Sequence, residues 1–165
     1  MINVVYVLDT SVLIELHNRY YPEVFVSLWD EIEKLVENEE AVSIKEVQNE
    51  LSTKGAKIHW NQINMDYNNQ FFRELDGEAV GCMQKIEELP MYHAKLKSGR
   101  SLEQEWGFGT AVADPFLICH GLYHESTVVT IENPDKAFNI PQVCKKLDVK
   151  CIGLKDFLLE NEFRF

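Results

Sequence analysis

The strongest constraint on the fold is an uninterrupted apolar run near the N-terminus that stops at a carboxylate. Val4 to Leu8 are five apolar residues in succession, and Asp9 follows directly. A strand with one face in water would alternate, so this run predicts a strand buried on both faces, as in the centre of a parallel sheet. Apolar residues then recur at helical spacing from Val12. Asp9 is therefore expected where a buried strand gives way to a helix, which is the edge at which open α/β sheets bind ligands.

The rest of the chain alternates short apolar runs with segments of helical periodicity. Further strands are predicted at 41–43, 126–130 and 149–152, and helices at 12–17, 22–36, 44–53, 78–89, 115–123, from 141 and at 154–158. This alternation predicts an α/β fold around a mostly parallel sheet. Residues 56–110 are less regular and are predicted to form a helical insertion or cap. No Pro/Gly/Ser-rich linker divides the chain, so residues 1–165 are expected to form one domain.

Composition narrows the function classes. The chain has 27 acidic and 16 basic residues, a net charge of -11, which argues against holding nucleic acid by bulk charge. Any nucleic-acid contact then needs a local basic patch, and Lys95, Lys97 and Arg100 are the candidates; a solvated loop is their simpler interpretation. The four cysteines lie far apart and indicate reduced thiols of a cytoplasmic protein. No apolar run approaches the roughly 20 residues that span a membrane, so no membrane partner is expected.

Four acidic residues occupy comparable places in the predicted elements. Asp9 ends the first strand, Glu50 lies on the helix after the second strand, Asp114 begins a helix and Glu132 follows a strand. The predicted fold puts three of them near one edge of the sheet. Clustered carboxylates repel one another and resist ionising together, so such a site favours a bound cation. Hard oxygen ligands suit Mg²⁺ or Mn²⁺, which would assist displacement at a phosphodiester.

These positions carry a resemblance to a known family. Residues 7–13 (VLDTSVL), 47–51 (VQNEL), 113–118 (ADPFLI) and 128–132 (VVTIE) resemble the four motifs of PIN-domain ribonucleases, in the order in which that family has them. The stretch from Ile140 to Gly153 further resembles an uncharacterised bacterial and archaeal PIN-like branch. The resemblance implies a three-layer α/β/α fold. It covers both ends of the chain well and the middle poorly.

The resemblance also implies an activity and roles for single residues. It implies a Mg²⁺- or Mn²⁺-dependent endoribonuclease, often the toxin of a toxin–antitoxin pair, with RNA as substrate and an antitoxin protein or a second copy of the chain as candidate partners. Carried over by position, Asp9, Glu50 and Asp114 would be metal ligands. Glu132 matches a more variable fourth acidic position, which is usually Asp or Asn.

Two threonines and a second glutamate complete the implied site. Thr10 and Thr130 would orient the ligands or a water molecule. Glu46 is a rival to Glu50, because residues four apart on one helix share a face. The position of Glu50 directly before Leu51 favours Glu50.

Simpler interpretations of the same residues stay open. Asp9 and Asp114 could each serve as an ordinary helix N-cap, and Glu50 could be a solvated helix residue. His120 and His124 are four apart, a spacing that can chelate a transition metal, although no Glu follows the first His as in zinc proteases. A half-buried helix face explains the two histidines more simply.

Two competing functions accompany the ribonuclease hypothesis. The first is a PIN-like scaffold without catalysis that binds RNA or a partner protein; acidic residues at all four positions favour the enzyme instead. The second is a phosphatase of the haloacid dehalogenase type, which also begins with a strand ending in Asp. That family has a second Asp two residues later, where this chain has Ser11.

Overall fold

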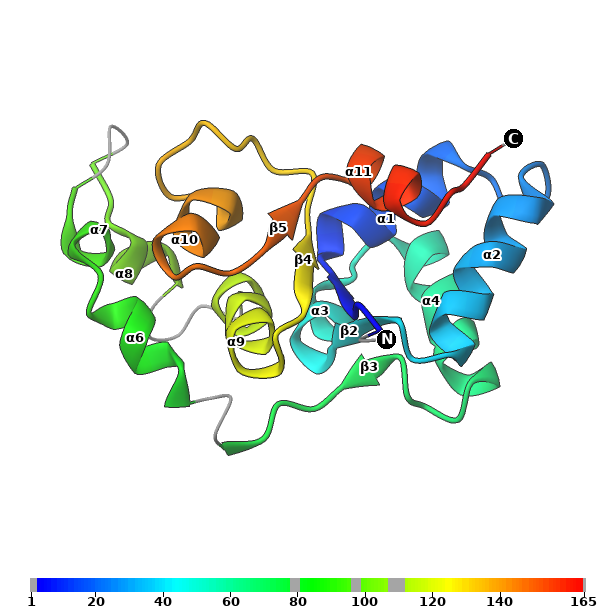
Figure 1. The fold of residues 1–165 in the computed structure, drawn as a ribbon, viewed down its shortest axis with the longest axis horizontal. Coiled ribbons are helices and arrows are strands. Elements are labelled where there is room, and N and C mark those ends of the chain that lie inside the picture. The colour runs from blue at the N-terminus through cyan, green and yellow to red at the C-terminus, as the bar shows by residue number, and fades with distance from the viewer. Residues whose placement is uncertain (1–2, 78–80, 96–98, 107–111, 165) are drawn as a thin grey trace.

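The computed structural model of the chain describes residues 3–77, 81–95, 99–106 and 112–164. The elements in chain order (Figure 1) are β1 (Tyr6–Leu8), α1 (Thr10–Arg19), α2 (Val26–Glu37), β2 (Ala41–Ile44), α3 (Lys45–Glu50), α4 (Lys54–Asp66), β3 (Phe72–Arg73), α6 (Met83–Glu87), α7 (Pro90–His93), α8 (Leu102–Trp106), α9 (Asp114–His124), β4 (Thr127–Val129), α10 (Ile140–Lys146), β5 (Cys151–Ile152) and α11 (Leu154–Glu160). Strands and helices alternate along most of the chain, which confirms the predicted α/β class.

The strands form one five-stranded sheet in the order β3-β2-β1-β4-β5. Every neighbouring pair is parallel, and Tyr6 of β1 is in register with Ala41 of β2 and Thr127 of β4. All carboxyl ends of the strands therefore lie at one edge. This order is consistent with a PIN-like topology.

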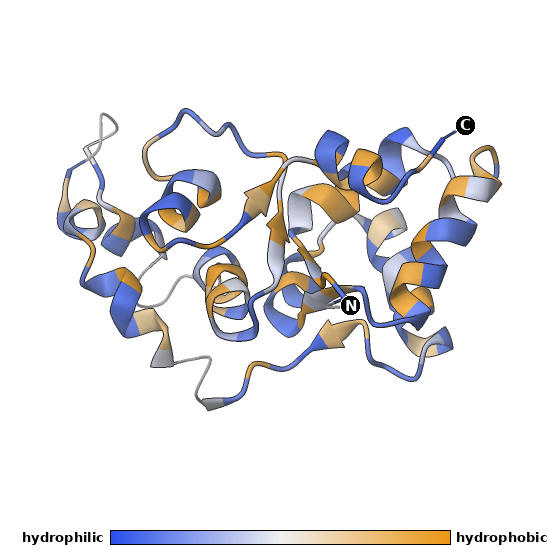
Figure 2. Cartoon of the chain, viewed as in Figure 1, coloured by the Kyte–Doolittle hydropathy of each residue, from blue (hydrophilic) through white to orange (hydrophobic). Residues whose placement is uncertain are grey.

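The first strand is central because its residues are apolar on both faces. Val7 and Leu8 are completely buried, as the uninterrupted apolar run predicts. The strands and the inner sides of the surrounding helices consist mainly of hydrophobic residues, drawn in orange in Figure 2. Helix α9 packs on β1, β2 and β4. In Figure 1, α9 and α10 lie to the left of the strands, and α1, α2 and α4 lie to the right. The sheet is therefore the middle layer between two layers of helices.

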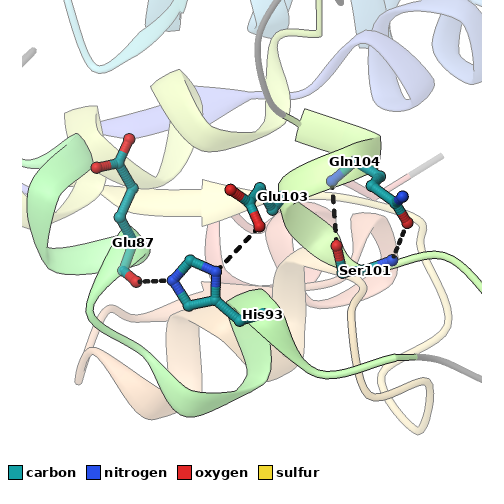
Figure 3. A network of polar contacts seen from close by, with 5 residues as sticks. All are labelled: Glu87, His93, Ser101, Glu103 and Gln104. Carbon is teal, nitrogen blue, oxygen red and sulfur yellow. Dashed lines mark hydrogen bonds and ion pairs between the residues drawn. The ribbon is translucent and has the colours of Figure 1, made fainter.

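A polar network organises the helices between β3 and α9 (Figure 3). Ser101 accepts the backbone N–H of Gln104 at its Oγ (3.3 Å), and the Gln104 side chain accepts the N–H of Ser101 (2.9 Å). This reciprocal pair is a capping box, which satisfies two unpaired donors at the start of α8. His93 ties α7 to α8 through Glu103 Oε2 (3.0 Å) and to α6 through the Glu87 carbonyl (3.1 Å).

The largest difference from the predicted elements falls between residues 54 and 73. Helix α4 begins at Lys54, one residue before Gly55, where a helix end was predicted. The strand β3 was not predicted, because only Phe72 and Arg73 form it. Part of the segment expected as an insertion therefore belongs to the sheet. Trp60 and Phe71 of this segment are buried core residues.

Proline positions explain two further boundaries. Pro22 was predicted to start the second helix, but it lies in a turn and α2 begins at Val26. A helix was predicted to end before Pro90, and α6 does end at Glu87; Pro90 then occupies the first turn of α7, where its missing N–H costs nothing. Across the described residues, no helix is long and apolar enough to span a membrane.

The close packing of α9 on the sheet predicts a cost for any side chain at Gly121. A Cβ there would lie 2.7 Å from Val149 Cγ1 and 2.9 Å from Val128 Cγ2, both in the core. We expect Gly121→Ala to destabilise the fold by about 1–2 kcal/mol in urea unfolding, despite the better helix propensity of Ala. Gly81→Ala is the matched control, because nothing lies within 4 Å of its Cβ position. Equal unfolding midpoints for the two variants would contradict this packing.

Candidate active site

Asp9 lies at the junction between β1 and α1 and is only 4% exposed. Its backbone N–H donates to the Val129 carbonyl (3.0 Å), which continues the pairing of β1 with β4. Its Oδ2 accepts hydrogen bonds from Ser11 Oγ (2.6 Å) and Thr130 Oγ1 (2.8 Å). Asp9 occupies the N-cap position of α1, but its side chain makes no capping hydrogen bond. Its carboxylate is instead held by hydroxyl groups from two elements.

Glu50 ends α3 and joins the starts of two other helices. Its Oε2 accepts a hydrogen bond from Thr10 Oγ1 (2.6 Å), at the first residue of α1. Its Oε1 accepts the backbone N–H of Ala113 (2.7 Å), directly before α9. Thr10 therefore orients an acidic residue other than its neighbour Asp9, and Glu50 lies beside the segment that carries Asp114.

Asp114 is the first residue of α9 and Pro115 is the second. Ala113, not Asp114, occupies the N-cap position, so the interpretation of Asp114 as an N-cap is wrong. The first turn of a helix is a favourable place for a negative charge. Its pKa is nevertheless raised to about 8, as described below.

Glu132 follows β4 and is partly buried. Its Oε2 accepts the backbone N–H of Ile140 (2.7 Å), which starts α10. Its own N–H donates to Thr130 Oγ1 (3.2 Å), the same hydroxyl that donates to Asp9. Thr130 thus connects the backbone at Glu132 to the carboxylate of Asp9.

Asp114 is harder to ionise than an ordinary aspartate because it is buried and has acidic neighbours. The pKa of Asp114 rises to about 8, first because of burial and then because of the negative charges of Asp9, Glu132 and Glu50; a hydrogen bond from Trp106 opposes the rise. Four acidic residues from separate parts of the sequence therefore lie within electrostatic reach of one another. We name Asp9, Glu50, Asp114 and Glu132 the acidic cluster.

Burial raises the pKa of two other members of the acidic cluster. Desolvation is the largest cause for Asp9, and it outweighs the hydrogen bonds from Ser11 and Thr130 that favour the charged form. Desolvation is also the largest cause for Glu132, with smaller contributions from Asp9 and Glu50. Without a cation, this part of the protein holds more negative charge than its surroundings stabilise.

The donor set fits a hard divalent cation in chemistry and charge. All four side chains offer carboxylate oxygens, the ligands that Mg²⁺ and Mn²⁺ prefer, and a bound cation would relieve their repulsion. As the side chains are placed, no group of three His, Cys, Asp or Glu residues among those described stands close enough to share one ion. Both oxygens of Glu50 are engaged in hydrogen bonds. Ion binding would thus require the carboxylates to reorient toward one another.

The two glutamates of α3 have different surroundings. Glu50 is the one that acts electrostatically on Asp9 and Asp114. Glu46 has a buried oxygen, Oε2, with no hydrogen-bond partner. The structure therefore places Glu50, rather than Glu46, in the acidic cluster.

The three basic residues predicted to contact RNA differ in their surroundings. Lys95 is exposed after α7. Arg100 binds residues of its own segment: its Nε lies 3.1 Å from Glu105 Oε1, and its Nη2 donates to the Gln104 carbonyl (3.3 Å). Lys97 lies outside the described residues. Of the three, Lys95 is the exposed cation that the structure describes without such a tether.

Three groups contribute to the site without having been predicted. Ser11 orients Asp9, and its place two residues after a strand-end aspartate was the available signal. Trp106 contacts Asp114 from α8, and a lone tryptophan in an irregular stretch gives no such signal. The backbone N–H of Ala113 donates to Glu50. Because almost every residue has a backbone N–H, the sequence gives no sign of this contact.

The raised pKa of Asp114 predicts how stability depends on pH. An acid whose pKa rises on folding, here from 3.8 to about 8, stabilises the fold below its unfolded pKa and loses that contribution as pH rises through its folded pKa. Metal-free protein should therefore lose stability from about pH 4 to about pH 8. Asp114→Asn should reduce this loss and be more stable than wild type near pH 8 by about 1–3 kcal/mol.

Urea unfolding in EDTA across this pH range measures the effect. Asp135→Asn is the control, because it removes an exposed loop carboxylate and should keep the wild-type pH dependence. If Asp114→Asn retained the wild-type pH dependence, the assigned electrostatics of the acidic cluster would be wrong.

Comparison with known proteins places the chain in a family. None of the curated proteins matches it. A family model described as "Domain of unknown function (DUF4411)" matches residues 6–165, nearly the whole chain. The chain, with its parallel five-stranded sheet and its acidic cluster, therefore belongs to the DUF4411 family.

Proposed function

We propose that this protein is a PIN-like endoribonuclease that depends on Mg²⁺ or Mn²⁺. The observation that carries the proposal is the acidic cluster: four carboxyl groups from distant sequence segments lie in electrostatic reach at one sheet edge, and burial together with the charges of the other three raises the pKa of Asp114 to about 8. Such repulsion is costly for stability and is typical of sites that hold cations for chemistry. The four segments around the acidic cluster resemble PIN-domain motifs, and this resemblance indicates the reaction, which is hydrolysis of RNA phosphodiester bonds.

The residues of the site would have distinct roles in this reaction. Asp9, Glu50 and Asp114 would hold the cation. Ser11 and Thr130 position the carboxylate of Asp9 through hydrogen bonds to its Oδ2. A divalent cation held there would supply an acidified water molecule and positive charge for an in-line displacement at phosphorus.

Two further residues, Thr10 and Ile140, position the glutamates of the site. Thr10 holds one oxygen of Glu50, and the backbone N–H of Ala113 holds the other at the start of α9. Glu132 is tied to α10 through Ile140 and would sit at the margin of the cation site.

An open groove beside Glu132 offers a path for an RNA segment. Its volume is about 610 Å³, and its lining includes Thr130, Glu132, Lys155, Leu158 and Leu159. The apolar side chains could pack against bases, and the exposed Lys155 could approach a phosphate. A substrate lying there would bring its backbone past the acidic cluster.

The same groove supports the proposed toxin role. Ile131 and Leu159 line it and remain 46% and 60% exposed, so two large apolar side chains of this groove face solvent. An antitoxin segment, or a second copy of the chain, that covered these residues would block access to Glu132. We therefore include inhibition by a protein partner in the proposal.

One observation favours the alternative of a non-catalytic PIN-like scaffold that binds RNA or a partner. Glu50 uses both oxygens to join Thr10 to Ala113, so it could serve purely as a link between helices. A scaffold of this kind would bind RNA or protein without a cation and would leave RNA intact.

The two glutamates of α3 provide a matched test of the catalytic proposal. We expect purified wild type to cleave RNA with Mn²⁺ or Mg²⁺ and to be inactive in EDTA. Glu50→Gln should lower cleavage by at least about 100-fold, because it removes a charged ligand. Glu46→Gln should stay within about twofold of wild type, because Glu46 lies outside the acidic cluster.

Thermal melting separates lost chemistry from lost folding. Mn²⁺ should raise the melting temperature of wild type and of Glu46→Gln, and it should raise that of Glu50→Gln less, because a ligand that binds only the folded state stabilises it in proportion to its affinity. Intact RNA with all three proteins, together with equal melting temperatures with and without Mn²⁺, would favour the scaffold.

A separate prediction concerns how a strongly acidic chain holds RNA. Lys95→Ala should weaken RNA binding and reduce the slope of log K against log salt by about 1, because one phosphate contact is lost. Lys34→Ala on α2 is the control, since Lys34 pairs with Glu31 of its own helix. Fluorescence anisotropy with labelled RNA in Mg²⁺ at several salt concentrations measures both. An unchanged slope for Lys95→Ala would exclude Lys95 as a contact.

A further inference from the structure

The four cysteines of the chain lie in two pairs, although they are spread over the sequence. All four are free thiols. The thiol of Cys144 is hydrogen-bonded to that of Cys151, and the thiol of Cys119 is hydrogen-bonded to that of Cys82. Two adjacent thiols can be oxidised to a disulfide, and access to the oxidant decides which of them react.

The chain between Cys144 and Cys151 folds back on itself. Cys144 lies on α10 and Cys151 is the first residue of β5, and these two elements pack against each other. The carbonyl of Cys144 accepts the backbone N–H of Val149 (2.9 Å), and Asp148 turns the chain in a left-handed conformation, with a φ of 56°. The backbone therefore brings the two cysteines together whether or not their sulfurs interact.

The two sulfurs of this pair differ in their access to solvent. Cys144 is completely buried, whereas Cys151 is partly exposed. Cys151 lines an open groove of about 530 Å³, which a small oxidant can enter. The hydrogen bond with Cys151 and then burial raise the pKa of the Cys144 thiol, so Cys144 keeps its proton and donates it in a hydrogen bond to the sulfur of Cys151. The more accessible sulfur thus lies at the groove, and the second lies behind it.

The other pair is buried on both sides. Cys119 is completely buried, and Cys82 is 9% exposed. Burial, and then Cys82, raise the pKa of Cys119 to about 12, which keeps this thiol protonated. Because the thiolate is the nucleophile and has to meet the oxidant, we expect Cys82 and Cys119 to stay reduced. They serve as an internal control for the first pair.

We propose that Cys144 and Cys151 form an oxidation-sensitive thiol pair, which a peroxide converts into a reversible disulfide between α10 and β5. First, the sulfur of Cys151 attacks one oxygen of hydrogen peroxide; the O–O bond breaks, a sulfenic acid forms and one water leaves. The sulfur of Cys144 then attacks the sulfur of the sulfenic acid; an S–S bond forms, the S–O bond breaks and a second water leaves. The two thiol hydrogens end in the two waters, and the two electrons lost by the sulfurs reduce the peroxide.

The disulfide joins two elements that hold the edge of the acidic cluster. The first residue of α10, Ile140, donates its N–H to Glu132 (2.7 Å). Ile152 of β5 accepts the backbone N–H of Thr130 at its carbonyl (3.1 Å). Oxidation therefore links the two elements that carry these contacts, and it makes this part of the fold harder to unfold.

Mass spectrometry of the full chain, treated with hydrogen peroxide in EDTA, tests the proposal. We expect wild type to lose two hydrogen atoms and to regain them with dithiothreitol. Lys145, Lys146 and Lys150 lie between the two cysteines, so trypsin leaves the cysteines on separate peptides that only the disulfide joins. Oxidation should also raise the melting temperature by a few degrees, because the cross-link restricts the unfolded chain.

Three variants separate the two steps. Cys151→Ser should keep its mass under peroxide, because Cys144 is buried; the changed residue is partly exposed, so the fold should persist. Cys144→Ala should gain one oxygen at Cys151, which dimedone traps, because the sulfenic acid finds no second thiol. Cys82→Ser alters only the control pair and should form the disulfide as wild type does.

The proposal would be overturned by any of three results. The first is a wild-type chain that gains oxygen at Cys151 without a cross-link to Cys144. The second is a disulfide between Cys82 and Cys119 in its place. The third is a wild-type chain whose mass stays unchanged under a peroxide concentration that oxidises free cysteine.

Discussion

The Asp9 carboxylate is buried, and the contacts that stabilise it there also position several of the surrounding elements. Because β1 is the central strand of a parallel sheet, the side chain at its carboxyl end has little access to water. Its charge therefore depends on protein hydroxyl groups, and Ser11 and Thr130 supply them from α1 and from the end of β4. The same contacts align β1, β4 and the first helix, so the residues that solvate Asp9 also position the sheet edge.

The acidic cluster shows how this fold concentrates charge at one place. Glu50 is held by Thr10 and by the N–H of Ala113, and these contacts keep its charge near Asp9 and Asp114. Stability alone would favour fewer charges here, because burial and mutual repulsion raise the pKa values of Asp114, Asp9 and Glu132. A cost of this kind is common where a site is shaped for function rather than for stability.

Sequence reasoning predicts the centre of this structure better than its margins. The apolar run before Asp9 and the β-branched run before Thr130 contain the strands β1 and β4, whose residues are all buried, so these strands and the sheet edge could be predicted. The strand β3 could not, because two residues carry no periodicity and their pairing with β2 is a long-range contact. Helix ends at Pro22 and Gly55 were misplaced, because local preference there yields to packing.

The site residues divide in the same way. Asp9 and Glu132 follow strands, Asp114 begins a helix, and Glu50 ends the helix that follows β2, so their approach to one another follows from parallel topology. The contacts that hold them come partly from groups with no sequence signature, such as the N–H of Ala113. The geometry of α9 relative to Asp9 therefore required the structure.

The hydrogen bond between Ala113 and Glu50 also makes the position of α9 less dependent on the chain that precedes it. It fixes the start of α9 to α3 at the point where the chain returns from the segment of α6, α7 and α8. Asp114 therefore takes its position from α3 and the sheet rather than from the length of the chain that precedes it. Because the closure entropy of a loop grows only slowly with its length, that segment can lengthen or shorten during evolution while the bond between Ala113 and Glu50 keeps the start of α9 on α3.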